Sequence, residues 1–218
     1  MRRDTVIFDF GGVITSSPFE AFNRLEDERG LPRDFIRRVN ALERDGNAWA
    51  RFERAEIDAV TFDAIFAAEA KALGHDLRGE DVLAVLAGDI RSRMVAALDW
   101  LKGNGYRIGC ITNNVPTGNG AGMARTAEKA AAIAAMLARF DCVIESSKVG
   151  IRKPDPAIYS MACEVLGVTP EQCVYLDDLG INCKPAAELG MAAIKVTDEV
   201  QALRDLEQAI GVPDGTFG

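Results

Sequence analysis

Three carboxylates stand where short apolar runs end in the sequence. Val6–Phe8 is followed by Asp9, and Val174–Leu176 is followed by Asp177 and Asp178. Removing an unpaired carboxylate from water is costly, so acids at the ends of buried strands need a cation or hydrogen-bond donors. Carboxylate oxygens are the ligands that hard metal ions prefer. These residue types and positions therefore predict a metal site.

The elements that must position these acids are five apolar runs. We predict strands at Thr5–Phe8, Arg107–Ile111, Cys142–Ile144, Cys173–Leu176 and Ala192–Val196. The runs are continuous rather than alternating, which is typical of strands buried on both faces. Helical patterns separate them, so we expect an α/β fold with a doubly wound, Rossmann-like parallel sheet. Ligands of such sheets bind at the carboxyl ends of the strands, where the acids and Thr112 lie.

Two helical patterns between these strands are clear. Each ends at a glycine, and their apolar positions are Met94, Ala97, Leu98 and Leu101 in one and Ile158, Met161, Ala162, Val165 and Leu166 in the other. From Ser16 to Gly88, by contrast, only helical patterns occur. We predict that residues 16–88 form a helical cap inserted after the first strand, and that residues 1–15 and 89–218 form the core. Such a cap would lie over the site and exclude water.

Composition excludes several classes of protein. The chain has 218 residues and a net charge of −8, without the clustered Lys and Arg of a nucleic-acid surface. No stretch is long and apolar enough for a membrane span or a signal peptide. Five scattered cysteines without a CxxC pair indicate reduced thiols. We expect a cytoplasmic protein, monomer or homodimer, that binds neither nucleic acid nor membrane.

Two further features are given structural interpretations. His75 is the one histidine, which excludes a multi-histidine metal site, and its Leu-Gly-His-Asp context suits a helix end. The loop 115–122 contains Gly118, Gly120 and Gly122 but does not follow the first strand and is not a dinucleotide-binding motif. We predict that it lies near the rim of the site.

Four segments in order resemble the haloacid dehalogenase superfamily of hydrolases. They are residues 6–13 (VIFDFGGV), 111–114 (ITNN), 153–156 (KPDP) and 175–178 (YLDD). Each is weak alone, but their order and strand-end placement match along nearly the whole chain. Residues 144–154 and 176–186 are most similar to the N-terminal phosphatase domain of soluble epoxide hydrolases and its bacterial single-domain relatives.

The resemblance implies a Mg²⁺-dependent phosphomonoester hydrolase of a small phosphorylated metabolite. Asp9 would be the nucleophile and form an aspartyl-phosphate. Mg²⁺ would be held by Asp9, the Gly11 carbonyl and Asp178, with Asp177 bound directly or through water. The alternatives from the residues alone are a helix N-cap for the paired acids and a simple capping or metal-binding role for Asp9.

Other positions complete the expected site. Thr112 and Asn113 would donate hydrogen bonds to a phosphoryl oxygen, although Asn-Asn also forms turns. Lys153 would offset the acids and bind the anion, unless it is simply exposed. Asp155-Pro156 is interpreted as a helix N-cap followed by its first residue, and Lys148 and Arg152 as solvated.

Gly11 departs from the family pattern. Phosphatases of this superfamily usually carry a second aspartate two residues after the nucleophile, as general acid and base, a role worth about 10²–10⁴-fold in rate. We therefore expect a slow phosphatase that prefers good leaving groups. Replacing Gly11 with Asp should raise activity if its backbone conformation suits Asp.

Two alternative functions stay open. A metal-independent dehalogenase needs no leaving-group protonation, but the paired Asp177 and Asp178 imply a cation. A phospho-ligand-binding protein would keep the site without turnover. The cap sequence does not identify the substrate; Trp49, Phe52 and Arg51 are candidate contacts, although aromatic residues in a helical insert more often form its core.

Overall fold

The computed structural model describes residues 3–116 and 126–218. Within them lies a parallel sheet with the strand order β3-β2-β1-β4-β5. The strands are β1 (Thr5–Phe8), β2 (Arg107–Thr112), β3 (Cys142–Glu145), β4 (Cys173–Asp177) and β5 (Ala192–Lys195). The predicted α/β class and parallel sheet are confirmed. β2, β3 and β4 each run one residue further than predicted, because the polar residues that end them still pair in the ladder.

β1 occupies the centre of the sheet, between β2 and β4. Its four residues are all buried. The pairing continues past the strand, because the Asp9 amide donates to the Leu176 carbonyl at 2.8 Å. Asp9 is therefore fixed beside the carboxyl end of β4, where the other two acids begin.

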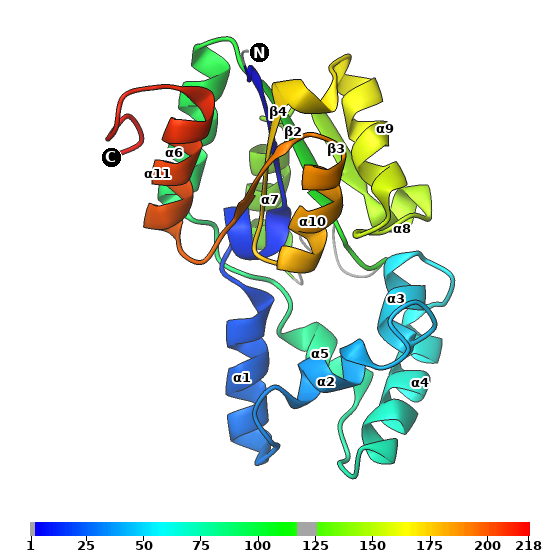
Figure 1. Ribbon diagram of the computed structural model, residues 1–218. Helices are drawn as coiled ribbons and strands as arrows, with labels where there is room; N and C mark the ends of the chain where they lie inside the picture. The colour runs from blue at the N-terminus through cyan, green and yellow to red at the C-terminus, as the bar shows by residue number, and fades with distance from the viewer. Residues whose placement is uncertain (1–2, 117–125) are drawn as a thin grey trace.

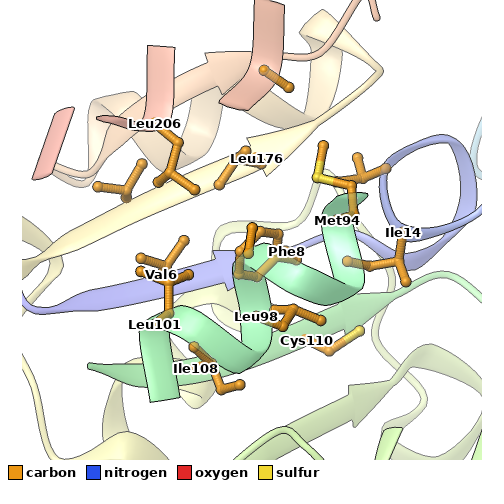
Figure 2. Close-up of a cluster of buried hydrophobic side chains, with 14 of the residues drawn as sticks. Val6, Phe8, Ile14, Met94, Leu98, Leu101, Ile108, Cys110, Leu176 and Leu206 are labelled. Carbon is orange, nitrogen blue, oxygen red and sulfur yellow. The ribbon is translucent and has the colours of Figure 1, made fainter. Parts of the chain in front are cut away.

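Helices cover both faces of the sheet. Successive side chains of β1 point to opposite faces, so Val6 and Phe8 join one hydrophobic cluster and Ile7 joins another. The first cluster packs against α6 (Ser92–Gly103), α7 (Ala127–Leu137) and α11 (Glu199–Ile210). Figure 2 shows Phe8 beside Leu98 and Met94 of α6. The second cluster packs against α9 (Pro156–Leu166) and α10 (Gly180–Glu188).

Most of the predicted helical faces are confirmed. Met94, Ala97, Leu98 and Leu101 are all buried, and α9 ends at Gly167 as expected. Val165 was wrongly assigned to the buried face of α9, since it is 60% exposed. The remaining short elements are α8 (Ser146–Val149), η1 (Phe10–Ile14) and η2 (Pro170–Gln172).

Between Pro18 and Ala84 the chain forms helices without any strand, as the sequence predicts. They are α1 (Pro18–Arg29), α2 (Phe35–Ala41), α3 (Ala48–Glu53), α4 (Ala59–Ala72) and α5 (Gly79–Ala84), together called the helical insert. The insert has its own hydrophobic cluster, in which the rings of Phe52 and Phe62 stack at 4.6 Å. It lies beyond the end of the sheet at which β1 terminates (Figure 1).

The chain enters and leaves the helical insert through two paired segments. The Ser16 amide donates to the Asp89 carbonyl at 2.8 Å, and the Arg91 amide donates to the Ile14 carbonyl at 2.9 Å. Thr15 and Ile90 form an antiparallel bridge between them. This pairing supports the division into a core (1–15 and 89–218) and a cap (16–88), which stays a proposal.

The structure also bears on three composition-based expectations. All five cysteines are buried and free. His75 follows α4 and lies against Phe35, with ring centroids 4.9 Å apart, which fits the structural interpretation. In the described residues no helix combines the length and the apolar character that a membrane span needs.

Candidate active site

Asp9 lies at the carboxyl end of β1 and is 8% exposed. Its Oδ1 accepts a hydrogen bond from the Phe10 amide at 2.6 Å. The chain then turns through Gly11 (φ −69°, ψ 130°) and Gly12 (φ +78°, ψ −14°). A Cβ at Gly12 would clash with Asp178 Oδ2, so this position needs glycine for both its conformation and its space. Gly12 thus allows Asp178 to approach the turn that carries Asp9.

Lys153 joins the acids from the two strands. Its Nζ lies 2.7 Å from Asp9 Oδ1 and 2.8 Å from Asp177 Oδ2, and its side chain is 1% exposed. Burial lowers the pKa of the ammonium group, but the charges of Asp177 and Asp9 outweigh burial and raise it. Lys153 is therefore a buried cation, and the expectation of positive charge at this position agrees with the structure.

Asp177 is fully buried and surrounded by donors. The Tyr175 hydroxyl donates to Oδ2 at 2.6 Å, the Leu179 amide donates to Oδ1 at 2.8 Å, and the Asn182 side chain donates to both oxygens at 3.1 Å. These bonds fix the carboxylate and leave it little capacity for a further ligand. Sequence reasoning did not assign Tyr175 or Asn182 a role, although both lie inside the segments that carry the family resemblance.

The three acids meet as expected from their strand ends. Asp9, Asp177 and Asp178 each offer a carboxylate oxygen within 4.8 Å of the others. Burial and the charge of Asp177 raise the pKa of Asp178 to about 6, and Ser17 donates to its Oδ2 at 3.3 Å. Burial is also the largest cause that raises the pKa of Asp9, partly offset by Lys153. Crowded oxygen ligands of this kind fit a divalent hard cation, which would relieve their repulsion.

Thr112 and Asn113 follow one another at the end of β2. Thr112 is the last strand residue and is 3% exposed. The Asn113 side chain pairs with the backbone of Lys153, accepting from its amide at 2.8 Å and donating to its carbonyl at 3.1 Å. Asn113 therefore holds the segment that carries Lys153, in addition to lining the site.

A cavity of about 620 Å³ lies between the sheet end and the helical insert. The core contributes the predicted site residues Asp9, Gly11, Thr112, Asn113, Lys153 and Asp178. The helical insert contributes mostly apolar and basic residues, among them Phe19, Phe22, Arg37, Arg44 and Trp49. Of the three candidate substrate contacts Trp49 lines the cavity. Phe52 and Arg51 do not, because Phe52 is buried against Phe62 and Arg51 lies beside Glu56.

One ion pair of the site was not anticipated. Arg152 was predicted to be solvated, but its side chain is 20% exposed and its Nε lies 2.7 Å from Oε2 of Glu53 in α3. This contact is an ion pair between the core and the helical insert. The prediction was wrong because the two residues are far apart in sequence, and only the fold of the insert brings them together. Lys148 is 72% exposed, as expected.

Two smaller expectations concern Asp155 and the glycines of the loop 115–122. Asp155 caps α9 through a 2.9 Å bond from the Ala157 amide, with Pro156 as the first helical residue, which confirms its structural interpretation. Gly118, Gly120 and Gly122 lie outside the described residues.

Comparison with known proteins shows which family this chain resembles. A family model described as haloacid dehalogenase-like hydrolase matches residues 3–190. The chain belongs to this family. Among curated members, mouse bifunctional epoxide hydrolase 2 is 31% identical over 97% of this chain and 39% of its own length. Phosphatase MT3486 of Mycobacterium tuberculosis (strain CDC 1551 / Oshkosh) is 28% identical over 99% of both proteins.

The haloacid dehalogenase-like fold is shared with solved structures. One is a family enzyme from Bacteroides thetaiotaomicron in complex with magnesium and inorganic phosphate, with a TM-score of 0.55 and 19% identity over 88% of this chain and 92% of that one. This likeness concerns the fold alone. The chain spans between 19% and 40% of the length of four mammalian proteins that it matches.

Proposed function

We propose that this haloacid dehalogenase-like hydrolase is a Mg²⁺-dependent phosphomonoester phosphatase with Asp9 as its nucleophile. The observation that carries the proposal is the contact of Asp9 with Lys153 at 2.7 Å, inside a cavity that Asp178 also lines. A carboxylate on a fixed turn can attack phosphorus and form an aspartyl-phosphate, which water then hydrolyses. A phosphatase among the relatives of matching length supports the same reaction.

Each residue of the core has a definable task in this reaction. Lys153 stays protonated because two carboxylates face it, so it can attract a phosphoryl group and balance charge as the group moves. Thr112 and Asn113 line the cavity at the end of β2 and can donate to phosphoryl oxygens. Asp177 also contacts the Lys153 ammonium group, at 2.8 Å, and is itself fixed by Tyr175.

The same arrangement supports a metal site. We propose that Asp9, the Gly11 carbonyl and Asp178 hold Mg²⁺, with Asp177 contributing through water because its oxygens already have protein donors. The donor set is made of hard oxygen atoms, and the missing side chain at Gly12 provides the room that Asp178 occupies. Bound Mg²⁺ would neutralise phosphoryl charge and orient the substrate.

The helical insert would act as a cap. Its residues line the cavity on the side away from the sheet, and the apolar and basic side chains there would contact the body of a small phosphorylated metabolite. We further propose a cytoplasmic protein that is a monomer or a homodimer.

A panel of aryl, acyl and alkyl phosphates, assayed with and without Mg²⁺, tests the proposal. We expect phosphate release that depends on Mg²⁺ and is lost in Asp9→Asn. Tight, unreacted binding of phosphate compounds in calorimetry, without turnover of any panel member, would instead indicate a phospho-ligand-binding protein. Halide release from haloacids without a metal would indicate a dehalogenase.

A further inference from the structure

The site needs a proton donor that the turn after Asp9 does not supply. Gly11 has no side chain, and the described residues that line the cavity include no histidine, cysteine or tyrosine. Their carboxyl groups are Asp9, Asp178, Asp45 and Glu53. Asp9 and Asp178 already have roles in the proposed function, and Asp45 is exposed. Glu53 is the buried carboxyl group that remains.

We propose that Glu53, delivered from the helical insert, is the general acid and general base of this enzyme. The inference rests on the proposed phosphatase function. Glu53 is the last residue of α3, its side chain is 8% exposed, and it lines the cavity that also contains Asp9 and Gly11. Glu53 comes from the insert and Asp9 from the sheet end, and in an in-line displacement the leaving group departs away from the nucleophile.

The contacts of Glu53 orient one oxygen toward the site. The Trp49 indole donates to Oε1 at 2.9 Å, which leaves Oε2 directed at the sheet end. There the Asn113 side-chain amide donates to Oε2 at 3.5 Å, and the Arg152 Nε forms an ion pair with the same oxygen at 2.7 Å. The Glu53 backbone carbonyl accepts from the Ser146 hydroxyl at 2.7 Å, so α3 is anchored independently of the carboxyl group.

The charges around Glu53 oppose one another. Burial raises the pKa of its carboxyl group, whereas the charge and close contact of Arg152, the bond from Trp49 and the charge of Lys153 lower it. The effect of burial is the larger, so the pKa stands above its usual value. A raised pKa favours the protonated form of this carboxyl group, and a carboxyl group that lines a reaction cavity can serve as general acid and general base.

Glu53 would transfer a proton in each of the two steps of the proposed reaction. In the first, an Asp9 oxygen bonds to phosphorus, the bond from phosphorus to the leaving oxygen breaks, and that oxygen takes the proton from Glu53. The product alcohol departs and Glu53 is left as a carboxylate. In the second, Glu53 takes a proton from water as the water oxygen bonds to phosphorus and the bond to Asp9 breaks. Inorganic phosphate leaves, and both carboxyl groups return to their starting states.

Glu53→Gln tests this role through the leaving group. With a series of substituted phenyl phosphates and an alkyl phosphate, we expect a loss of about 10²-fold or more for the most basic leaving groups. The first half-reaction should be nearly unchanged for p-nitrophenyl phosphate, whose leaving group needs no protonation. Phosphorylated Asp9 should then accumulate, because the base of the second step is missing, and intact-protein mass spectrometry would detect it.

Glu69→Gln is the matched control. Glu69 also belongs to the insert, accepts from the Ala48 amide at the start of α3, and has a pKa raised by burial, but it does not line the cavity. We expect its kinetics to follow those of the unsubstituted enzyme for every leaving group. An equal loss for all leaving groups in Glu53→Gln, without accumulated phosphoenzyme, would overturn the proposal and assign Glu53 to docking of the insert.

A rescue experiment gives a second, independent readout. Gly11 has an ordinary backbone conformation, and a Cβ there would meet only Pro18 Cδ at 3.9 Å. The double variant Gly11→Asp, Glu53→Gln should hydrolyse the alkyl phosphate at least about tenfold faster than Glu53→Gln alone. No rescue in a folded double variant would count against proton transfer by Glu53. An unsubstituted enzyme inactive on every phosphate would instead refute the phosphatase function itself.

Discussion

Lys153 is the residue on which the balance of charge at the site depends. It contacts carboxylates from both strand ends and is almost fully buried. A buried charge is tolerated only when it is paired and hydrogen-bonded. The sequence predicted the charge from its position in the family motif, but not the double contact, which requires the pairing of β1 with β4.

Gly12 supports a second prediction about a single residue. Gly12→Ala should lose most Mg²⁺ binding, because its Cβ would clash with Asp178 Oδ2 and its φ is positive. Gly11→Ala is the matched control, since its φ is negative and its Cβ would have ample space. Isothermal titration with Mg²⁺ measures the difference. Equal affinities in the two variants would contradict the assigned position of Asp178.

At the scale of elements, the contact between α3 and α8 fixes the insert over the sheet. The Ser146 hydroxyl is fully buried and donates to the Glu53 carbonyl at 2.7 Å and lies 3.1 Å from the Asn114 carbonyl. The Asn114 amide donates to the same hydroxyl at 3.1 Å. One side chain thus joins the helical insert to the loop after β2.

Ser146→Ala should therefore destabilise the protein by about 1–3 kcal/mol, because it leaves buried backbone groups unpaired. It should also raise KM more than it lowers kcat, since the insert would be less firmly placed. Urea denaturation and steady-state kinetics measure the two effects. Ser160→Ala, at an exposed position of α9, should change neither. A similar stability loss in both variants would refute the joining role of Ser146.

The elements also show what the sequence could and could not predict. Strand positions followed from continuous apolar runs, because burial on both faces leaves a strong local signal. The three acids could be placed together, because parallel strands end at one edge. Arg152 and Glu53 could not be paired, since nothing local in the sequence specifies how α3 folds back over the sheet. Phe52 was a candidate substrate contact because the local sequence does not specify how the insert packs. Only the structure shows that Phe52 belongs to the hydrophobic cluster inside the insert.

At the scale of the whole molecule, two separate hydrophobic regions meet at the cavity. One includes Leu98 and other residues on a face of the sheet, and the other, which includes Phe62, lies inside the insert. The crowded acids lie where these regions meet, so the apo protein carries electrostatic repulsion at the junction. A ligand that binds only the folded state and relieves this repulsion stabilises the whole molecule.

We accordingly expect Mg²⁺ to raise the melting temperature. At a concentration one hundred times Kd the gain in free energy of unfolding should be about 2.7 kcal/mol. Asp178→Asn should abolish the shift, whereas Asp198→Asn, at the N-cap of α11, should keep it. Differential scanning fluorimetry across a Mg²⁺ series measures it. An undiminished shift of the melting temperature in Asp178→Asn would show that Mg²⁺ binds elsewhere.

The delivery of Glu53 from α3 has a consequence for how such enzymes diversify. The proposed nucleophile Asp9 and the other two acids belong to strand ends, whereas Glu53 belongs to the insert, which the chain enters and leaves through two paired segments. If the proposed roles are correct, a graft of the insert between homologues would carry a proton-transfer group along with the residues that contact the substrate. In chimeras of this kind, reaction chemistry and specificity would be inherited together.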